Sequence, residues 1–292
     1  MTVPAGTGFV SQVALDSTMK GGCIGQVVAS RNSDFPVGAK TEGMTNWQTY
    51  CLCAPGSPKL RALPPDADPE VEIGPAGGTA LTAYFGLLRI GKPEPGETVL
   101  VSAAAGGTGV NAGMIAKIAG CRVVGTAGTD EKCRWLVEEM GFDAAVNYKS
   151  GDLRKELRAA CPDGVDIFFD NVGGEILELA LGLLNTYARV VICGAIANYQ
   201  SDTPTGPSNY QALAGKHASM TGFTVYHYRE ELTEARAQLR EWVAAGQMQT
   251  ALSVYEGLSE APAALMGLYA GDNQGKVTVR IGEEEALPPA RL

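Results

Sequence analysis

The sequence has no long hydrophobic run, and no apolar stretch reaches the length that a bilayer-spanning helix needs. It also has no excess of positive charge, because 23 lysines and arginines stand against 32 aspartates and glutamates, a net charge of −9. A chain of this charge is a poor partner for nucleic acid or for an anionic membrane surface. We therefore expect neither partner, although local groups can still bind a small anion.

Histidine is scarce: His217 and His227 are the only two, and neither stands at a metal-binding spacing from the other or from a cysteine. The seven cysteines are odd in number, scattered and mostly set among apolar neighbours. This usage is typical of reduced thiols in a cytosolic protein. The first residues lack a basic segment followed by an apolar one, so we expect no signal peptide and a cytoplasmic location. From the spacing of the histidines and cysteines we expect no metal.

A strand, a turn of very small residues, a helix and a second strand follow one another over residues 98–132. Val99, Leu100 and Val101 suit a strand covered on both faces, and the turn carries the spacing Ala104-x-Gly106-x-x-Gly109. Small residues there permit a tight turn and close approach of the backbone to a pyrophosphate. The helix N-terminus adds unpaired N–H groups and partial positive charge. The segment predicts a dinucleotide site, although an ordinary turn rich in alanine and glycine can share the pattern.

Strands and helices alternate through the following residues. Between helical patterns, strand patterns recur at 122–126, 144–148, 165–171, 189–194 and 219–225. This alternation predicts an α/β fold with a doubly wound parallel sheet of strand order 3-2-1-4-5-6. A helix over 77–92 precedes the sheet, and an amphipathic helix over 229–245 follows it.

The ends of the chain have a different composition from this central part. The residues before the first helix are rich in glycine, proline and short β-like runs, such as 25–30 and 47–53, and strand patterning returns in the tail. We expect residues 78–247 to form the nucleotide-binding domain, and residues 1–77 with 248–292 to form a β-rich domain.

The end of the second strand predicts which coenzyme binds. A carboxylate there would accept hydrogen bonds from the adenosine ribose and repel a ribose phosphate. The turn over residues 125–129 contains no acid before Asp130, and Lys132 follows on the first turn of the next helix. Its ammonium can face a phosphate, which favours NADP(H) over NAD(H). A lone helix lysine is otherwise more often simply solvated.

Six further patterns occur together in this chain, at residues 98–106, 128–132, 142–149, 169–174, 192–199 and 271–276. Together they resemble the zinc-independent medium-chain dehydrogenases/reductases, in the branch of prostaglandin reductases, leukotriene hydroxydehydrogenases and alkenal or curcumin reductases. The resemblance implies a Rossmann domain joined to a GroES-like β-rich domain. Typical members begin several dozen residues earlier, so this second domain is expected to be N-terminally shortened. We expect its substrate pocket to be open, rebuilt or covered by a partner.

The resemblance implies NADPH-dependent reduction of the carbon–carbon double bond of α,β-unsaturated ketones or aldehydes. Hydride would go to the β-carbon and a proton to the α-carbon of this small-molecule substrate. One alternative is a quinone reductase of the same superfamily, and another is a catalytically impaired NADPH-binding protein with a sensory or scaffold role. The resemblance also implies a homodimer formed through the edges of two Rossmann sheets.

The resemblance assigns cofactor-binding residues by their position in the motifs. The pyrophosphate residues are expected to be Gly106, Gly107, Thr108 and Gly109. The residues at the adenosine end are expected to be Lys132 for the ribose phosphate and Tyr148. The nicotinamide side is expected to be lined by Asn171, Cys193, Gly194, Ala195, Ile196 and Tyr199. Backbone is expected to reach the carboxamide from Phe223, Thr224 and Val225, and Asn273 is expected to make a further contact.

Tyr210 is the expected catalytic residue, because family members place a tyrosine at this position near the ribose and the substrate carbonyl. Hydride addition to an enone builds negative charge on oxygen, and a donor aimed there lowers the barrier. The alternative for Tyr210 is a surface aromatic, and Tyr199 and Tyr226 are weaker candidates for the same role. Two residues depart from the branch: Thr108 and Asn111 stand where its members usually have apolar residues.

Overall fold

The computed structural model describes residues 13–54, 60–199, 203 and 205–282. The chain divides into two compact units. The first, which we call the sheet unit, comprises residues 74–253 and 273–276. The second, which we call the split unit, comprises the residues up to 73, residues 254–272 and those from 277 onward.

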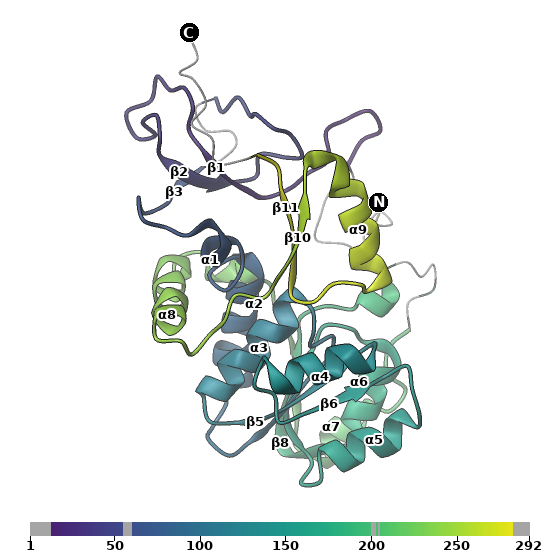
Figure 1. Cartoon of the computed structure of the whole chain (residues 1–292). Coiled ribbons are helices and arrows are strands. Elements are labelled where there is room, and N and C mark those ends of the chain that lie inside the picture. Colours follow the sequence, from purple (N-terminus) through teal and green to yellow (C-terminus); the bar gives the residue numbers. More distant parts are fainter. Residues whose placement is uncertain (1–12, 55–59, 200–202, 204, 283–292) are drawn as a thin grey trace. The chain divides into compact units, whose positions relative to one another are not determined.

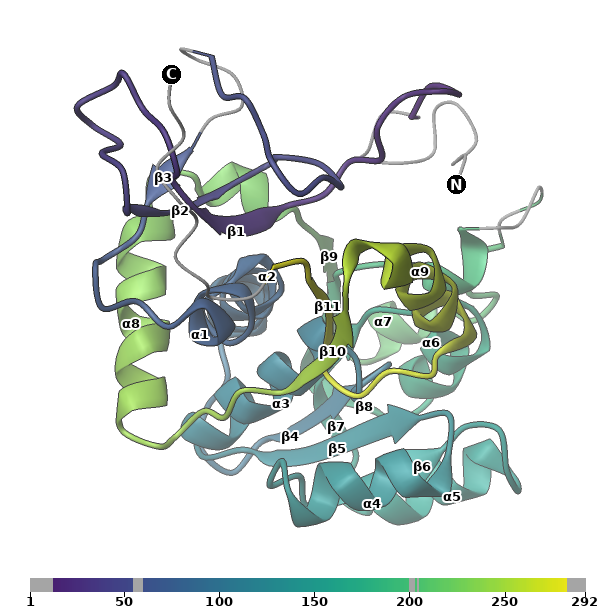
Figure 2. The same cartoon turned by 45° about the horizontal axis from the view of Figure 1, so that its top comes forward.

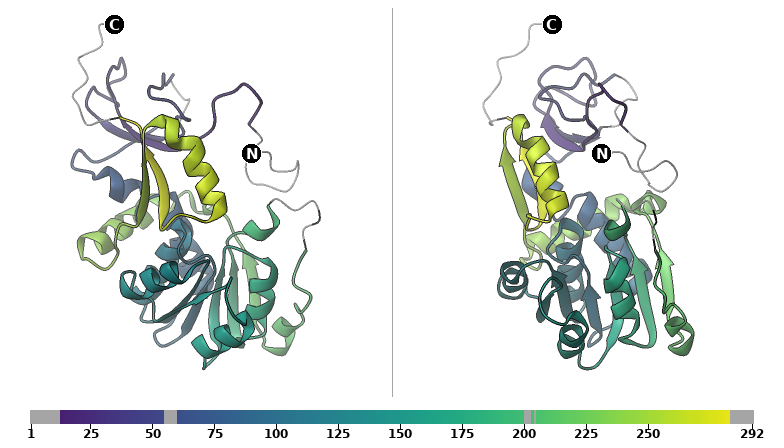
Figure 3. Two further views of the ribbon diagram at one scale, coloured as in Figure 1. Left: turned by 45° about the vertical axis from the view of Figure 1, so that its right-hand side comes forward. Right: turned by 90° about the vertical axis from the view of Figure 1, so that its right-hand side faces the viewer.

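A six-stranded parallel sheet forms the centre of the sheet unit (Figures 1 and 3). Its strands are β4 (Thr98–Val101), β5 (Arg122–Ala127), β6 (Ala144–Asn147), β7 (Val165–Asp170), β8 (Leu184–Ile192) and β9 (Ser219–Gly222). They are hydrogen-bonded in the order β6-β5-β4-β7-β8-β9, with parallel neighbours throughout. This confirms the predicted order 3-2-1-4-5-6. Since the order reverses between β4 and β7, a crevice is expected at their carboxyl ends.

Helices cover both faces of this sheet (Figure 3). They are α2 (Gly78–Phe85), which continues into a π-helix over Gly86–Gly91, α3 (Gly107–Ile118), α4 (Asp130–Glu138), α5 (Leu153–Ala160), α6 (Gly174–Leu181), α7 (Ala212–Gly215) and α8 (Leu232–Ala244). One face buries Leu100, Val124 and Phe168 against Leu157 of α5 and the apolar residues of α6. No helix in the described ranges is long and apolar enough to cross a membrane.

The split unit contains short elements joined by long connections (Figure 2). Its strands β1 (Cys23–Gln26), β2 (Lys40–Gly43) and β3 (Arg61–Ala62) form an antiparallel sheet, and its helices are α1 (Pro69–Ile73) and α9 (Ala261–Ala270). Arg61 links β2 to α1, because its guanidinium lies 2.6 Å from Glu42 and 3.1 Å from Glu72. A two-stranded sheet of β10 (Leu252–Glu256) and β11 (Lys276–Arg280) has residues in both units.

The strand predicted over residues 47–53 is wrong. The segment consists of bends and irregular backbone, and Tyr50 and Leu52 are 60% and 97% exposed. Alternating apolar residues indicate a strand only where one face is buried, and here Tyr50 and Leu52 face solvent while Trp47, Cys51 and Cys53 are only partly buried. The helix predicted over 229–245 begins at Leu232, because a 3₁₀ turn occupies Val225–Tyr228.

Candidate cofactor site

The turn between β4 and α3 leads directly into a helix whose first backbone N–H groups have no acceptor within the helix. Gly106 is the N-cap of α3, with extended backbone, and no side chain caps the helix. The N–H groups of Gly107, Thr108 and Gly109 belong to the first turn, where no intrahelical acceptor exists. A Cβ on Gly109 would lie 2.7 Å from the Cα of Ala104, so the helix approaches the turn this closely only with glycine there. These features suit a pyrophosphate.

Asn111 braces this first turn from inside the helix. Its side-chain amide donates a hydrogen bond of 2.6 Å to the carbonyl of Gly107, and the residue is only 4% exposed. The departure from the branch at this position therefore adds a polar contact beneath the glycine turn. Its own carbonyl oxygen is buried and has no hydrogen-bond partner within the described chain.

A distant segment of the same unit lies against the glycine turn. The N–H of Gly275 donates to the carbonyl of Ala105 at 2.8 Å, and Gly275 forms a parallel bridge with Gly106. The amide of the buried Asn273 donates to the carbonyl of Gly275 at 2.7 Å. Asn273 thus lies beside the turn, as its predicted contact requires, and it also shapes the segment that carries Gly275.

Lys132 and Tyr148 gather around the turn that follows β5. Thr129 caps α4 by accepting a hydrogen bond from the Lys132 N–H at 3.2 Å, and Lys132 is 9% exposed. A Cβ on Gly128 would lie 3.1 Å from the Tyr148 hydroxyl, so the tyrosine lies directly over the turn. The side chain of Asp130, the first acid after the turn, accepts a hydrogen bond from Asn147 at 2.7 Å. The structure thus places Lys132 and the Tyr148 hydroxyl at this turn, and their predicted contacts with a ribose phosphate stay a prediction.

A buried carboxylate organises the carboxyl end of β7. Asp170 is fully buried and accepts hydrogen bonds from the Ser102 hydroxyl at 2.8 Å, the Val172 N–H at 2.9 Å and the Gly173 N–H at 3.0 Å. Burial raises the pKa of Asp170, and these donors partly offset the effect. Asn171 is fixed to the same serine, because its side-chain amide donates to the Ser102 carbonyl at 2.7 Å. Sequence reasoning did not assign Ser102 or Asp170, although each is polar at the end of a buried strand.

The loop after β8 meets Asn171 at this point. The N–H groups of Cys193 and Gly194 donate to the carbonyl of Asp170 at 2.8 and 3.1 Å, and the Ile196 N–H donates to the carbonyl of Asn171 at 3.3 Å. The Ala195 N–H and the Tyr199 hydroxyl are 3.4 Å apart. All six residues predicted for the nicotinamide side are thus brought together. Burial raises the pKa of Cys193 to about 12, with a smaller effect from the charge of Asp170, so this thiol is neutral.

Phe223 lies inward at the carboxyl end of β9. Its ring and that of Phe169 lie over Gly86, where a Cβ would come within 2.5 and 2.8 Å of them. This contact fixes the side chain of Phe223 to the core. Thr224 precedes the 3₁₀ turn that begins at Val225, and both residues are partly buried, so the predicted backbone contacts of this segment stay a prediction.

Tyr210 stands apart from these residues. The backbone N–H of Ser208 and the side-chain amide of Asn209 donate to Glu178 of α6 at 2.9 and 2.8 Å, which holds the segment against that helix. Tyr210 itself is 59% exposed. Throughout the described residues, no hydrogen bond or ring contact joins it to the other predicted site residues. Its catalytic role stays a prediction.

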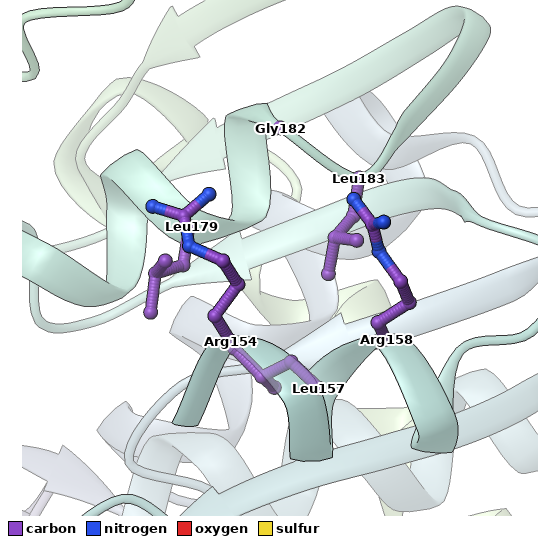
Figure 4. A pocket seen from close by; sticks show the side chains of 6 residues that line it. All are labelled: Arg154, Leu157, Arg158, Leu179, Gly182 and Leu183. Carbon is purple, nitrogen blue, oxygen red and sulfur yellow. The ribbon is translucent and has the colours of Figure 1, made fainter. Parts of the chain in front are cut away.

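A small hollow between α5 and α6 contains none of the predicted residues (Figure 4). It is lined by Arg154, Leu157, Arg158, Leu179, Gly182 and Leu183. The candidate site is instead the edge where β4, β5, β7 and β8 end. In the described ranges of the chain, no group of three or more His, Cys, Asp or Glu residues could hold a metal ion.

Comparisons with known proteins agree with this arrangement. Residues 107–241 match a family described as "Zinc-binding dehydrogenase", and residues 3–59 match "N-terminal domain of oxidoreductase". The chain is 42% identical to prostaglandin reductase 1 of Bos taurus, covering 90% of this chain and 81% of that one. It is 35% identical to the NADPH-dependent curcumin reductase of Escherichia coli, covering 94% and 81%. The crystal structure of CurA in complex with NADPH from Vibrio vulnificus matches with a TM-score of 0.87 and 35% identity, covering 95% and 84%.

These matches define an oxidoreductase of the medium-chain class, with a Rossmann domain and a GroES-like domain. The chain belongs to the zinc-independent medium-chain dehydrogenases/reductases, in the branch of prostaglandin, curcumin and alkenal reductases.

Proposed function

We propose that this chain catalyses NADPH-dependent reduction of the carbon–carbon double bond of α,β-unsaturated ketones and aldehydes, with hydride added at the β-carbon and a proton at the α-carbon. The relatives named for prostaglandin, curcumin and 2-alkenal reduction support the reaction class. The observation that carries the proposal is the sheet edge described above. Along it lie an uncapped glycine turn, the turn that holds Lys132, and the loops fixed by Asp170.

The residues of this edge divide the work of binding. The N–H groups of 107–109 bind the pyrophosphate, and Lys132 with Tyr148 binds the phosphate on the adenosine ribose. Asn171 and the loop over residues 193–199 form the nicotinamide side. NADPH supplies the hydride when bound, so no protein nucleophile is needed, which agrees with the neutral thiol of Cys193.

A hydroxyl donor near the substrate carbonyl completes the proposed site. Negative charge builds on that oxygen as the double bond is reduced, and a hydrogen bond that strengthens with this charge lowers the barrier. We assign this donor to Tyr210, whose exposed side chain is open to a ligand.

Turnover of a panel of small enones, enals and quinones tests the proposal. With NADPH deuterated at the transferable position, mass spectrometry and NMR of the product should show deuterium at the β-carbon of a saturated ketone. Faster reduction of quinones than of enones would favour a quinone reductase. Tight NADPH binding without turnover of either acceptor would favour a cofactor-binding protein and refute the proposed reaction.

We also propose a homodimer that forms through β9. This strand is at the edge of the sheet, and all four of its residues are exposed, so its free backbone groups can pair with those of a second copy. Analytical ultracentrifugation should show a dimer at micromolar concentration, and a monomer there would exclude it. The seven free thiols support a cytoplasmic location, which cell fractionation checks.

A further inference from the structure

Two cysteines of the split unit have their sulfur atoms in contact. Cys51 and Cys53 are one residue apart, the closest spacing of any two cysteines in the sequence. Their Sγ atoms are 3.7 Å apart, and the Cys53 thiol is the donor in this contact. The same thiol lies 3.8 Å from the carbonyl oxygen of Cys51. Since both residues belong to the split unit, this dithiol pair is complete within one unit.

The dithiol pair can be reached from solvent. Both cysteines are partly exposed, and Leu52 between them is 97% exposed. The two residues lie in irregular backbone, outside any helix or strand. A small reagent can therefore approach the sulfur atoms, and no ladder of sheet hydrogen bonds holds the backbone of the pair.

The spacing of the two sulfur atoms suits the formation of a disulfide. An S–S bond is about 2.05 Å long, so the two atoms need to approach each other by less than about 2 Å. Rotation of the side chains and a small adjustment of the irregular backbone can supply this movement. The buried thiols of the sheet unit differ in chemistry, because burial raises the pKa of both Cys121 and Cys161 to about 11. They are therefore inert.

The two thiols of the pair differ in their surroundings. Burial raises the pKa of Cys53, and the hydrogen bond to Cys51 and the charge of Cys51 add to this rise. Cys53 therefore keeps its proton and directs it at the Cys51 sulfur, which favours negative charge on Cys51. The thiolate is the nucleophilic form of a cysteine. Cys51 is thus the thiol that reacts first, and Cys53 is the thiol that attacks second.

We propose that Cys51 and Cys53 form a redox site that hydroperoxides oxidise reversibly to an intramolecular disulfide. The Cys51 thiolate attacks one peroxide oxygen, an S–O bond forms, the O–O bond breaks, and Cys51 becomes a sulfenic acid. The departing alkoxide or hydroxide takes up the proton that Cys51 released. The Cys53 sulfur then attacks the Cys51 sulfur, the S–S bond forms, the S–O bond breaks, and hydroxide leaves as water with the Cys53 proton.

This sequence of steps balances within the pair and its oxidant. The two thiols lose two electrons, and the hydroperoxide gains them. Glutathione reverses the change by thiol–disulfide exchange and is itself oxidised to its disulfide. The inference goes beyond the proposed function and does not rest on it, because neither NADPH nor an enone takes part.

Peptide mass spectrometry of the full chain tests the inference. Trypsin should release residues 41–59, a peptide that contains Cys51, Cys53 and no other cysteine. The chain is treated briefly with hydrogen peroxide, and N-ethylmaleimide then blocks the remaining thiols. The parent peptide should carry no label and should be lighter than the reduced, unlabelled peptide by two hydrogen atoms. Glutathione added before the label should restore two labelled cysteines.

Single serine variants separate the roles of the two thiols. Cys53→Ser lacks the second thiol, so peroxide should leave a sulfenic acid on Cys51 that dimedone traps. The parent should give no such adduct, because the disulfide forms instead. Cys51→Ser should give neither disulfide nor adduct under the same treatment. Cys23→Ser removes another partly exposed thiol and is the matched control, which should be oxidised like the parent.

Two labels on the parent peptide after peroxide would overturn the inference, because the pair would then have stayed reduced. A disulfide from Cys51 or Cys53 to another cysteine, or to a second copy of the chain, would also overturn it. An adduct on Cys51→Ser and none on Cys53→Ser would refute the order assigned to the two thiols. Turnover of enones enters none of these measurements, so failure of the proposed function would be seen separately.

Discussion

The hydroxyl of Ser102 donates a 2.8 Å hydrogen bond to Oδ1 of Asp170. Ser102 directly follows β4, and Asp170 is the last residue of the neighbouring strand β7. The same hydroxyl accepts a hydrogen bond from the Asn171 N–H at 2.8 Å. One serine therefore connects the two strands between which the sheet reverses its order. Asp170 in turn holds the backbone of the loop that begins at Val172.

Asp170→Asn is expected to change how stability depends on pH. Burial raises the pKa of Asp170 above its value in the unfolded chain, so the folded protein binds this proton more tightly. As pH rises from about 4 through the raised pKa, this titration lowers the free energy of unfolding of the parent. The asparagine variant lacks the titration, so its stability relative to the parent should increase over that interval. Urea unfolding of both proteins across this range measures the difference, and a constant or falling difference contradicts the assignment.

Gly86→Ala is expected to destabilise the protein by about 1–3 kcal/mol. The new Cβ would come within 2.5 Å of the ring of partly buried Phe223 and 2.8 Å of the ring of fully buried Phe169, so at least the Phe169 ring cannot move freely. Gly78→Ala, in the adjoining helix α2, is the matched control, because nothing lies within 4 Å of a Cβ there. This control should be neutral or stabilising by about 0.5–1 kcal/mol. Similar unfolding midpoints for the two variants would show that position 86 is not crowded.

The sheet and its order could be predicted because local patterns determine them. Val99, Leu100 and Val101 indicate a buried strand, and the glycine spacing after them indicates a close turn into a helix. The Ser102–Asp170 contact could not be predicted in this way, because it depends on the register between strands 68 residues apart in sequence. The hydrogen bond from Gly275 to Ala105 is likewise a product of long-range packing. The exposed Leu52 shows the converse, since a strand-like pattern there has no buried face.

Cys193 is expected to resist alkylation in the folded protein. Only the thiolate reacts with iodoacetamide, and burial raises the pKa of this thiol to about 12. At about pH 8, peptide mass spectrometry should therefore find Cys193 unmodified until urea unfolds the chain. Partly exposed Cys23 serves as the internal comparison and should be modified first. Modification of Cys193 at the rate of Cys23 would show a reactive thiol at the proposed nicotinamide side.

Lys132→Ala is expected to reduce selectivity for NADPH over NADH. Loss of one charge-assisted contact to the ribose phosphate should lower kcat/KM for NADPH about ten- to a hundredfold. Activity with NADH should change little, because that coenzyme has no phosphate at this position, and it therefore reports on folding. Steady-state kinetics with both coenzymes give the ratio. An equal fall for both would mean that Lys132 acts on the fold of the turn after β5.

Tyr210→Phe is expected to lower kcat for enone reduction by at least about tenfold, while the Kd for NADPH is unchanged. The substitution removes only the hydroxyl proposed to donate to the substrate oxygen, and such donors contribute more in the transition state than in the bound ground state. Tyr187→Phe, on the exposed surface of β8, is the matched control and should keep full kcat. Tyr199→Phe and Tyr226→Phe test the alternative donors. If one of these variants loses kcat while Tyr210→Phe retains it, that other tyrosine is the donor. Tyr210 is then a surface aromatic without a catalytic role.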